Sequence, residues 1–411
     1  MKQNRRLEII GILSLSLMLT STFAVSSCVP EMMKTFHEYD RSSVELLISS
    51  STFSVILMIA LTPILSRYLS ERFMVVTGLL IYGICGSAPF FLTSYPLILA
   101  SRIVMGIGVG MVNAKAVSMI GERFEGNLRS KLLGIRCSME TIGQTVLMLA
   151  VGQLLYLGWN YAFIIYTAAF VILGIYLAFV PDKANTLSNT SSQMSDTDEQ
   201  HLNTIGKEDE TKSKRSRRVN ICLADGIVIL SNFSLGFTLV SAASINNLRI
   251  TTYVVESGFG QASDGANVLS MSVFAGFFGG LIFGRLMAKL GNRILPLVLL
   301  GVSAGMTAIG FADTLIVVAI GTCICNFCIT LGTSYMFNRL SENLSTEVLG
   351  IGNSIVLVGC NLGACTISFV LQAISLISPK LTVGFFFYAV LYLILSIIFF
   401  VKYRTSSSRR P

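Results

Sequence analysis

The sequence predicts an all-α membrane protein in which about twelve helices cross the bilayer. Charged residues make up 13% of the 411 positions, hydrophobic residues make up 53%, and the mean hydropathy is +0.71. Soluble domains carry roughly 25% charged residues. Here the charges avoid about twelve apolar segments of roughly twenty residues, each long enough to cross a hydrocarbon core of ~30 Å. These runs are too long for barrel strands, so helices must satisfy the backbone in lipid.

The expected spans follow one another along the chain, and most are separated by short turns. Their boundaries are 7–29, 44–65, 73–92, 96–120, 131–156, 159–180, 219–242, 266–288, 294–312, 314–337, 348–374 and 382–401. An even number of spans places both termini on one side of the membrane. Cytoplasmic loops are enriched in Lys and Arg, so the distribution of these residues identifies that side.

The basic residues are concentrated on one side of the expected topology. The N-terminus, the even-numbered loops and the C-terminal tail hold most of the 30 Lys and Arg residues. The other loops hold only Lys34, Arg41, Arg249 and Lys380. We therefore expect a multi-pass protein of the cell membrane with both termini in the cytoplasm. The net charge of +8 follows from this topology and gives no reason to expect nucleic-acid binding.

A polar segment, residues 181–218, divides the chain into an N-terminal bundle (1–180) and a C-terminal bundle (219–411) of six spans each. The segment is rich in Ser, Thr, Asp, Glu and Lys and ends in KSKRSRR. Such a composition buries too little apolar surface to fold. We expect a disordered cytoplasmic linker whose basic end binds the head groups of anionic membrane lipids.

The two bundles share a repeated sequence. NLRSKLLGIRCSMETIGQ begins at Asn127 and NLSTEVLGIGNSIVLVGC begins at Asn343, with Asn, Leu, Leu, Gly, Ile, Ser and Gly at matching positions. Both segments lead into the fifth span of their half. Such repeats are typical of transporters in which two similar bundles face each other across a central path. A receptor or a membrane enzyme has no general need for them.

The residues offer little support for an enzyme, an ATP-driven pump or a metalloprotein. His37 and His201 both lie outside the spans, and no phosphate-binding G-x-x-x-x-G-K-[ST] loop is present. The sequence CICNFC places Cys323 and Cys325 two residues apart, and such side chains point to different sides of a helix. We therefore expect no enzyme activity, no cofactor and no metal.

Two loops carry related motifs. GRLMAKLGNR follows the eighth span and contains Gly284, Lys289, Gly291 and Arg293, whereas TPILSRYLSER follows the second span and contains Arg67. Both resemble the G-x-L-x-D-R-x-G-R-K motif of the major facilitator superfamily, although Ser and Ala replace the acid. These residues are gating-loop candidates, because basic turns can pair with acids or helix C-termini of the same half.

Two further motifs extend the resemblance over essentially the whole chain. RIVMGIG, from Arg102 to Gly108, is similar to the family's R-x-x-x-G-x-G motif, and GWNYAF opens the sixth span as it commonly does in the family. The resemblance implies two pseudo-symmetric six-helix bundles, a monomer and an Arg102 associated with proton coupling. Of the Gly-Pro and paired glycines usual in drug-efflux antiporters only Gly152 remains, which counts against antiport but not against the superfamily.

Charged residues within the expected spans are candidates for coupling, because ionisable groups at bilayer depth are costly and often functional. The coupling candidates are Arg102, Lys115, Arg136 and Glu140. Arg136 and Glu140 are four residues apart and share one helix face. Lys115 lies at a similar depth on the antiparallel neighbouring span, so we expect one carboxylate to be shared by two cations.

Two interpretations of these charges remain open. In the first, Glu140 exchanges a proton while its pairing with Lys115 or Arg136 changes, and this couples proton movement to rocking of the bundles. In the second, the charges form a static ion pair between two spans. The repeat-equivalent positions in the other half are Gly352 and Val356. This asymmetry is the main argument for a role in transport, because the fold does not need the charges.

Polar side chains in the spans are candidates for the substrate cavity. In the superfamily the first, fourth, seventh and tenth spans usually line the path. The substrate-cavity candidates are Asn113, Asn246, Asn326 and Tyr335. On the fourth span we expect the face with Arg102, Gly106 and Asn113 to line the cavity, although its glycines also permit close helix packing.

The sequence thus predicts a secondary active transporter for proton-coupled export of small organic compounds by alternating access. Met, Phe and aliphatic residues dominate the spans, which favours a partly apolar substrate. Uptake or exchange of an anionic metabolite is an alternative, because cations outnumber acids within the spans. A non-transporting membrane sensor or scaffold, with the linker as its interaction element, is the alternative from another class.

Overall fold

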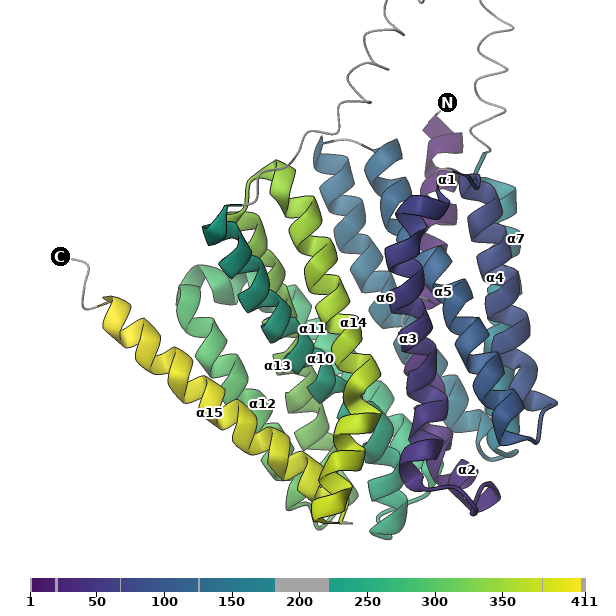
Figure 1. The fold of residues 1–411 in the computed structure, drawn as a ribbon, viewed down its shortest axis with the longest axis vertical. Coiled ribbons are helices and arrows are strands. Elements are labelled where there is room, and N and C mark those ends of the chain that lie inside the picture. Colours follow the sequence, from purple (N-terminus) through teal and green to yellow (C-terminus); the bar gives the residue numbers. More distant parts are fainter. Residues whose placement is uncertain are drawn as a thin grey trace, which may run out of the picture.

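The computed structural model describes residues 2–18, 21–66, 68–124, 126–181, 222–378 and 380–407. These residues are almost entirely helical and contain no strand. Figure 1 shows their helices as two neighbouring groups, α1–α7 and α10–α15. The predicted linker lies outside the described residues apart from its first position.

The N-terminal bundle begins with an interrupted span and continues with regular helices. After Ser14 the described residues wind as 3₁₀ helix up to Cys28, so the first span is not a continuous α-helix. The elements are α1 Lys2–Ser14, η1 Leu15–Met18, η2 Ser21–Cys28, α2 Val29–Thr35, α3 Arg41–Leu65, α4 Glu71–Ser87, η3 Ala88–Phe90, α5 Tyr95–Arg123, α6 Gly126–Leu154, η4 Trp159–Thr167 and α7 Ala168–Phe179.

The C-terminal bundle consists of long helices joined by short turns. Its elements are α10 Leu223–Glu256, α11 Ala262–Leu290, η5 Gly291–Arg293, α12 Ile294–Gly310, α13 Leu315–Asn343, α14 Thr346–Ile377 and α15 Thr382–Ser407. The repeated sequence leads into α6 in one bundle and α14 in the other, and each is the fifth span of its half.

Local sequence signals explain several helix ends. The Ser70 hydroxyl accepts a hydrogen bond from the Phe73 amide at 3.2 Å, which caps α4. The Asp264 carboxylate accepts a hydrogen bond from the Gln261 amide at 2.8 Å and closes a capping box on α11. At the other end of α11, Gly291 adopts a φ of +54°, a backbone region that favours glycine.

The expected end of the seventh span at residue 242 is wrong, because α10 continues to Glu256. The polar run SINN, residues 244–247, lies just beyond the expected end of this span. In the structure these side chains are buried inside a continuous helix. As a result Arg249, expected in an outer loop, lies within the span.

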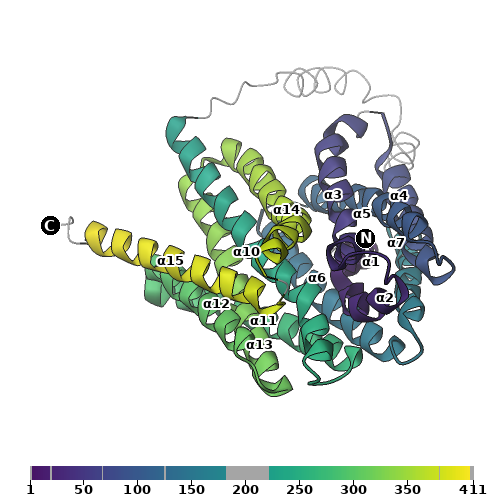
Figure 2. The same cartoon turned by 60° about the horizontal axis from the view of Figure 1, so that its bottom comes forward.

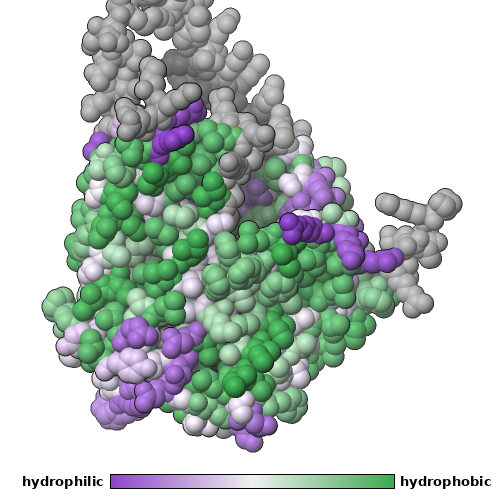
Figure 3. Space-filling model, turned by 180° about the vertical axis from the view of Figure 1, so that it is seen from behind, coloured by the Kyte–Doolittle hydropathy of each residue, from purple (hydrophilic) through white to green (hydrophobic). Residues whose placement is uncertain are grey.

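The surface matches a lipid environment. Figure 3 shows apolar side chains across the middle of the molecule and hydrophilic side chains gathered towards its ends. Ten stretches of the described residues are long and apolar enough to cross a membrane, and one of them, Ala262–Gly310, spans two helices. The protein is therefore a multi-pass membrane protein.

Each bundle is packed mainly within itself. In the N-terminal bundle α5 packs on α3 and α4, and in the C-terminal bundle α13 packs on α11 and α12. At the upper end in Figure 1, Arg123 donates a hydrogen bond to Glu8 at 2.7 Å and also pairs with Glu71, which ties α5 to α1 and α4.

The two bundles meet along three pairs of elements. These pairs are α6 with α11, α3 with α14, and η2 with α10.

The repeat produces an equivalent close contact in each bundle. A Cβ on Gly143 of α6 would overlap the backbone carbonyl of Leu17 in the first span. At the matching position of the repeat, a Cβ on Gly359 of α14 would lie 2.7 Å from the Phe233 ring of α10, the first helix of its bundle. At Gly143 the fifth span approaches the backbone of the first too closely for a side chain, whereas at Gly359 an added methyl group would have to displace the Phe233 ring.

We predict that Gly143→Ala destabilises the protein by about 1–3 kcal/mol, because the added methyl group forces two helices apart. The measurement is the thermal unfolding temperature of the purified protein in detergent. Gly174→Ala on α7 is the matched control, because nothing lies within 4 Å of the Cβ it would add. Equal unfolding temperatures for the two variants would contradict the close contact.

Candidate functional site

The molecule has two ends, and the contact between the bundles differs between them. We call the end at which α7 finishes at Phe179 and α10 starts at Leu223 the linker side, and the other end the far side. The linker side is at the top of Figure 1, and Figure 2 brings the far side forward. Helices α3 and α11 start on the far side, whereas α6, α10 and α14 end there.

Polar contacts between the bundles lie on the far side. Arg249 of α10 donates a hydrogen bond through Nε to Glu45 Oε1 of α3 at 3.1 Å, and both side chains are buried. Nearer the surface, Arg41 Nη2 and Glu256 Oε1 are 2.6 Å apart. The hydroxyls of Ser49 on α3 and Ser368 on α14 are 2.8 Å apart. These contacts join the same two bundles at successive depths.

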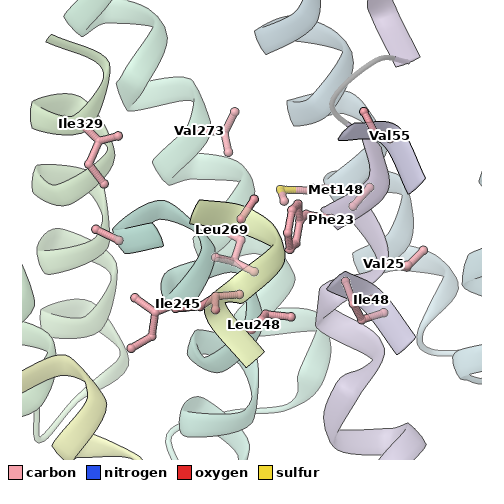
Figure 4. Close-up of a cluster of buried hydrophobic side chains, with 14 of the residues drawn as sticks. Phe23, Val25, Ile48, Val55, Met148, Ile245, Leu248, Leu269, Val273 and Ile329 are labelled. Carbon is pink, nitrogen blue, oxygen red and sulfur yellow. The ribbon is translucent and has the colours of Figure 1, made fainter. Parts of the chain in front are cut away.

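Apolar side chains fill the space around these contacts. Figure 4 shows Phe23 and Met148 of the N-terminal bundle beside Leu269 of the C-terminal bundle, within one buried cluster. A Cβ on Gly152 of α6 would lie 3.0 Å from the Ala266 Cβ of α11, so the backbones come close here too. The far side is therefore closed by both apolar packing and ion pairs.

The same helix faces are uncovered towards the linker side. On α3, Ser49 is fully buried, but Phe53 is 63% exposed and Ala60 is also exposed. These positions are four and eleven residues from Ser49 and share its face. On α11 the corresponding change runs from buried Ala266 to exposed Gly280. The bundles therefore make contact on the far side and separate on the linker side.

Three of the predicted site residues form one polar cluster in the N-terminal bundle. Arg136 Nη2 donates hydrogen bonds to Glu140 Oε1 at 2.5 Å and to Asn113 Oδ1 at 3.2 Å. Asn113 and Arg136 each lie about 15 Å from the linker-side end of their helix, at a rise of roughly 1.5 Å per residue. All three side chains are half-buried, which leaves the carboxylate and guanidinium within reach of water.

Lys115 does not join this cluster. Within the described part of the chain no ion pair links Lys115 to Glu140, so the expectation of one carboxylate shared by two cations is wrong. Lys115 is seven residues from Gly108, which packs on Gly78 of α4, and seven-residue spacing keeps one helix face. The Lys115 side chain is buried on the α4 side of α5, away from Asn113.

Arg102 lies in the packed interior of the N-terminal bundle. Its guanidinium donates hydrogen bonds to the backbone carbonyls of Thr22 at 2.8 Å and Leu47 at 3.2 Å. Its Cζ lies 5.7 Å from the Phe163 ring centroid and 5.3 Å from the Tyr166 centroid, within the range of cation–π attraction. One buried cation thus ties together η2, α3, α5 and η4.

The expected cavity face of the fourth span is wrong at Gly106. A Cβ on Gly106 would overlap the backbone carbonyl of Ser51 on α3. This face of α5 is therefore packed against its own bundle near Arg102 and reaches polar partners only at Asn113. The alternative expectation, that these glycines allow close helix packing, describes the contact found.

We predict that Arg102→Lys lowers the free energy of unfolding by about 1.5–3 kcal/mol, because Lys keeps the charge but loses the forked donors and the planar ring contact. Thermal unfolding in detergent measures this. Arg285→Lys, at an exposed position of α11, is the control. A variant at Arg102 that keeps full stability would show that the residue does not hold the bundle together.

The cavity candidates of the C-terminal bundle have different surroundings. Asn326 Nδ2 donates to Ser272 Oγ at 2.7 Å, and this joins α13 to α11. Asn246 is fully buried, and neither side-chain amide atom has a hydrogen-bond partner among the described residues. Tyr335 is buried and its hydroxyl lies 3.4 Å from Asn292 Oδ1 in the α11–α12 turn. Tyr335 therefore supports this turn and does not line an open cavity.

The gating-loop candidates are only partly described. Arg67 lies outside the described residues. Gly284, Lys289 and Arg293 are exposed on the linker side, and Gly291 forms the turn. Among described residues no ion pair involves Lys289 or Arg293, so the pairing role of this loop stays a prediction.

A groove of about 320 Å³ lies at the linker-side ends of α10 and α14. Gly226, Ile229, Leu230, Phe233 and Ile355 line it. All these side chains are apolar, so the groove offers no group that would orient a polar solute.

The sequence interpretation missed Glu45 and Arg249. Glu45 stands at the second position of the expected second span, at the edge of the apolar run, and was not among the charged residues taken as site candidates. Arg249 was assigned to a loop because the span was ended too early. The uncharged residues that follow it, ITTYVV, were the signal that the helix continues.

The family of the chain follows from its sequence. A sequence model of the Major Facilitator Superfamily matches residues 11–368, which is most of the chain. The protein therefore belongs to this superfamily of membrane transporters and is a secondary transporter of small molecules, not an enzyme. No curated protein sequence matches the chain.

Solved transporter structures share the fold. The inward-open xylose transporter XylE from E. coli superposes with a TM-score of 0.71 and 15% identity, over 97% of this chain and 95% of that one. A D-xylose-proton symporter gives 0.75 and 16% over 95% and 96%. A POT family transporter in complex with 5-aminolevulinic acid gives 0.74 and 13% over 97% and 96%. The predicted fold class, two six-helix bundles of transmembrane helices, is confirmed, and identities this low carry no information on substrate.

Proposed function

We propose that the protein exports small organic compounds across the cell membrane by proton-coupled alternating access. The linker side, with both termini, is cytoplasmic in this proposal, because most Lys and Arg residues lie there. The two bundles, residues 1–180 and 219–411, are the moving bodies, and residues 181–218 connect them.

The observation that carries the proposal is one-sided closure. Matching helix faces are buried on the far side and exposed on the linker side, as Ala266 and Gly280 of α11 illustrate. A transporter in this state exchanges solute with the cytoplasm only. For an exporter this is the state that takes up its substrate.

The cluster of Arg136, Glu140 and Asn113 is the proposed coupling site. It places one carboxylate, one guanidinium and one amide together at depth in the membrane, where an ionisable group is a candidate for proton transfer. Protonation of Glu140 releases Arg136 from its ion pair and changes which polar groups are free to bind a solute. The alternative of a static pair gives the same contacts without a change during transport.

We predict that Glu140→Gln abolishes solute-driven proton movement, because the amide cannot take up a proton. The assay uses purified protein in liposomes with a trapped pH dye, a pH gradient and a panel of lipophilic cations, neutral compounds and organic anions. Glu342→Gln, which removes an exposed acid of α13 bonded to Asn338, is the control and should behave as the wild type. Intact coupling in the Glu140 variant at equal protein levels would contradict the proposed role.

Exchange of an anionic metabolite is the second candidate, and one feature favours it. Arg136 Nη2 donates to the neutral amide of Asn113 as well as to Glu140, so a substrate carboxylate could take the place of Glu140 as its acceptor once Glu140 is protonated. Proton movement triggered by organic anions alone would support this candidate. No movement across the whole panel, with folded protein confirmed, would contradict both candidates.

A further inference from the structure

The far-side contacts contain two ion pairs of opposite polarity between the same two helices. Helix α3 contributes Arg41 and, one turn further in, Glu45, whereas α10 contributes Glu256 and, two turns further in, Arg249. The outer pair is half-exposed, with side-chain exposures of 26% for Arg41 and 43% for Glu256. The inner pair is enclosed, with exposures of 0% for Glu45 and 3% for Arg249. Breaking the inner pair therefore leaves buried charges without a partner, whereas breaking the outer pair leaves charges that water can solvate.

The inner pair is incomplete on the side of the carboxylate. Arg249 bonds to Glu45 Oε1, while Glu45 Oε2 is buried and has no hydrogen-bond partner among the residues that the structure describes. A carboxylate with a free, desolvated oxygen depends on its single guanidinium. The free oxygen is also the atom on which a proton can bind without displacing an existing hydrogen bond.

Few other charged groups act on Glu45. Arg41 and Glu256 lie on its outer side, and the Arg102 guanidinium of α5 is bound to the Leu47 carbonyl. Helix α14 presents Ser368, which is uncharged, and η2 carries no charged residue. On α2, Glu31 and Lys34 pair with each other. Among the charged groups around Glu45, Arg249 is therefore the one in direct contact with its carboxylate.

We propose that Glu45 and Arg249 form a pH-sensitive latch that holds the far side closed and opens when Glu45 is protonated. A proton from water on the far side binds Glu45 Oε2 and produces a neutral acid. Arg249 remains a cation, and in the closed state it is then buried without a counter-charge, which is strongly unfavourable. Separation of the bundles returns Arg249 to water. The latch rests on the proposed alternating access, and it adds a control over when the far side opens.

The sequence alone pointed to a different acid, Glu140, which lies in one bundle only. Glu45 differs because its partner is in the other bundle, so its ionisation acts directly on the distance between the bundles. The half-exposed outer pair lies between Glu45 and the far-side water, and such pairs contribute little to stability. It can therefore open often enough to let a proton reach the inner pair.

The test measures the distance between the bundles by spin-label electron resonance. Labels are attached to cysteines that replace His37 and Ser257, both exposed on the far side, in a chain whose native cysteines are replaced. Spectra are recorded at roughly pH 8 and roughly pH 5. Replacing His37 also removes a nearby group that titrates in this range. The measurement needs no transported solute. The latch can therefore be contradicted while the proposed transport is supported, and transport can be contradicted while the latch is supported.

In the labelled parent protein we expect a longer-distance population that grows on acidification. Glu45→Gln should populate it at both pH values, with an open-to-closed ratio raised by on the order of a hundredfold, because breaking a buried pair is costly. Glu256→Gln is the matched control and should keep the pH response of the parent. A Glu45 variant that is closed at the higher pH and opens only on acidification, as the parent does, would overturn the proposal.

A second variant covers the case in which a single substitution disturbs folding. Glu45→Gln combined with Arg249→Gln removes both charges, leaves two amides that can bond to each other, and should restore the closed distance with no pH response. Recovery of closure by the double variant would separate the latch from a general loss of structure. A double variant that stays open would show that the unpaired charge of Arg249 is not what opens the far side, and would overturn the proposed mechanism.

Discussion

The buried ion pair between Glu45 and Arg249 is the interaction on which the described state depends. Each charge is out of water and has the other as its compensation, so the closed far side accommodates both charges together but not one of them alone. The serine hydroxyls and the apolar cluster that contains Phe23 and Leu269 exclude water around the pair. With the bundles held together at this end, the remaining length of α3 and α11 is left uncovered towards the linker side.

Other strong contacts act within one bundle and keep its helices together. Arg102 binds two backbone carbonyls and two aromatic rings, and Arg123 bonds to two carboxylates at the linker end. Gly143 and Gly359 allow the first and fifth spans of their bundles to touch. A bundle held in this way moves as one body, so a change of access concentrates at the interface between bundles.

The fold was largely predictable because membrane helices leave a strong signal. Apolar runs located the spans, and the repeat at Asn127 and Asn343 identified the duplicated bundles. The site was less predictable, because burial and partners depend on which helices meet. Spacing alone paired Arg136 with Glu140, but only the packed structure could show that Arg102 binds carbonyls of its own bundle. Arg249 was lost because a polar run within a helix resembles a loop.

The central claim is that the bundles are closed on the far side and open on the linker side, and thiol accessibility along α11 tests it most directly. Single cysteines replace Val273, Gly280 and Gly284, and a membrane-impermeant maleimide is added to one side of sealed membranes at a time. The account predicts reaction at 280 and 284 from the linker side, and protection at 273 from both sides. Reaction at 273 as fast as at 280, or reaction at 280 only from the far side, would contradict it.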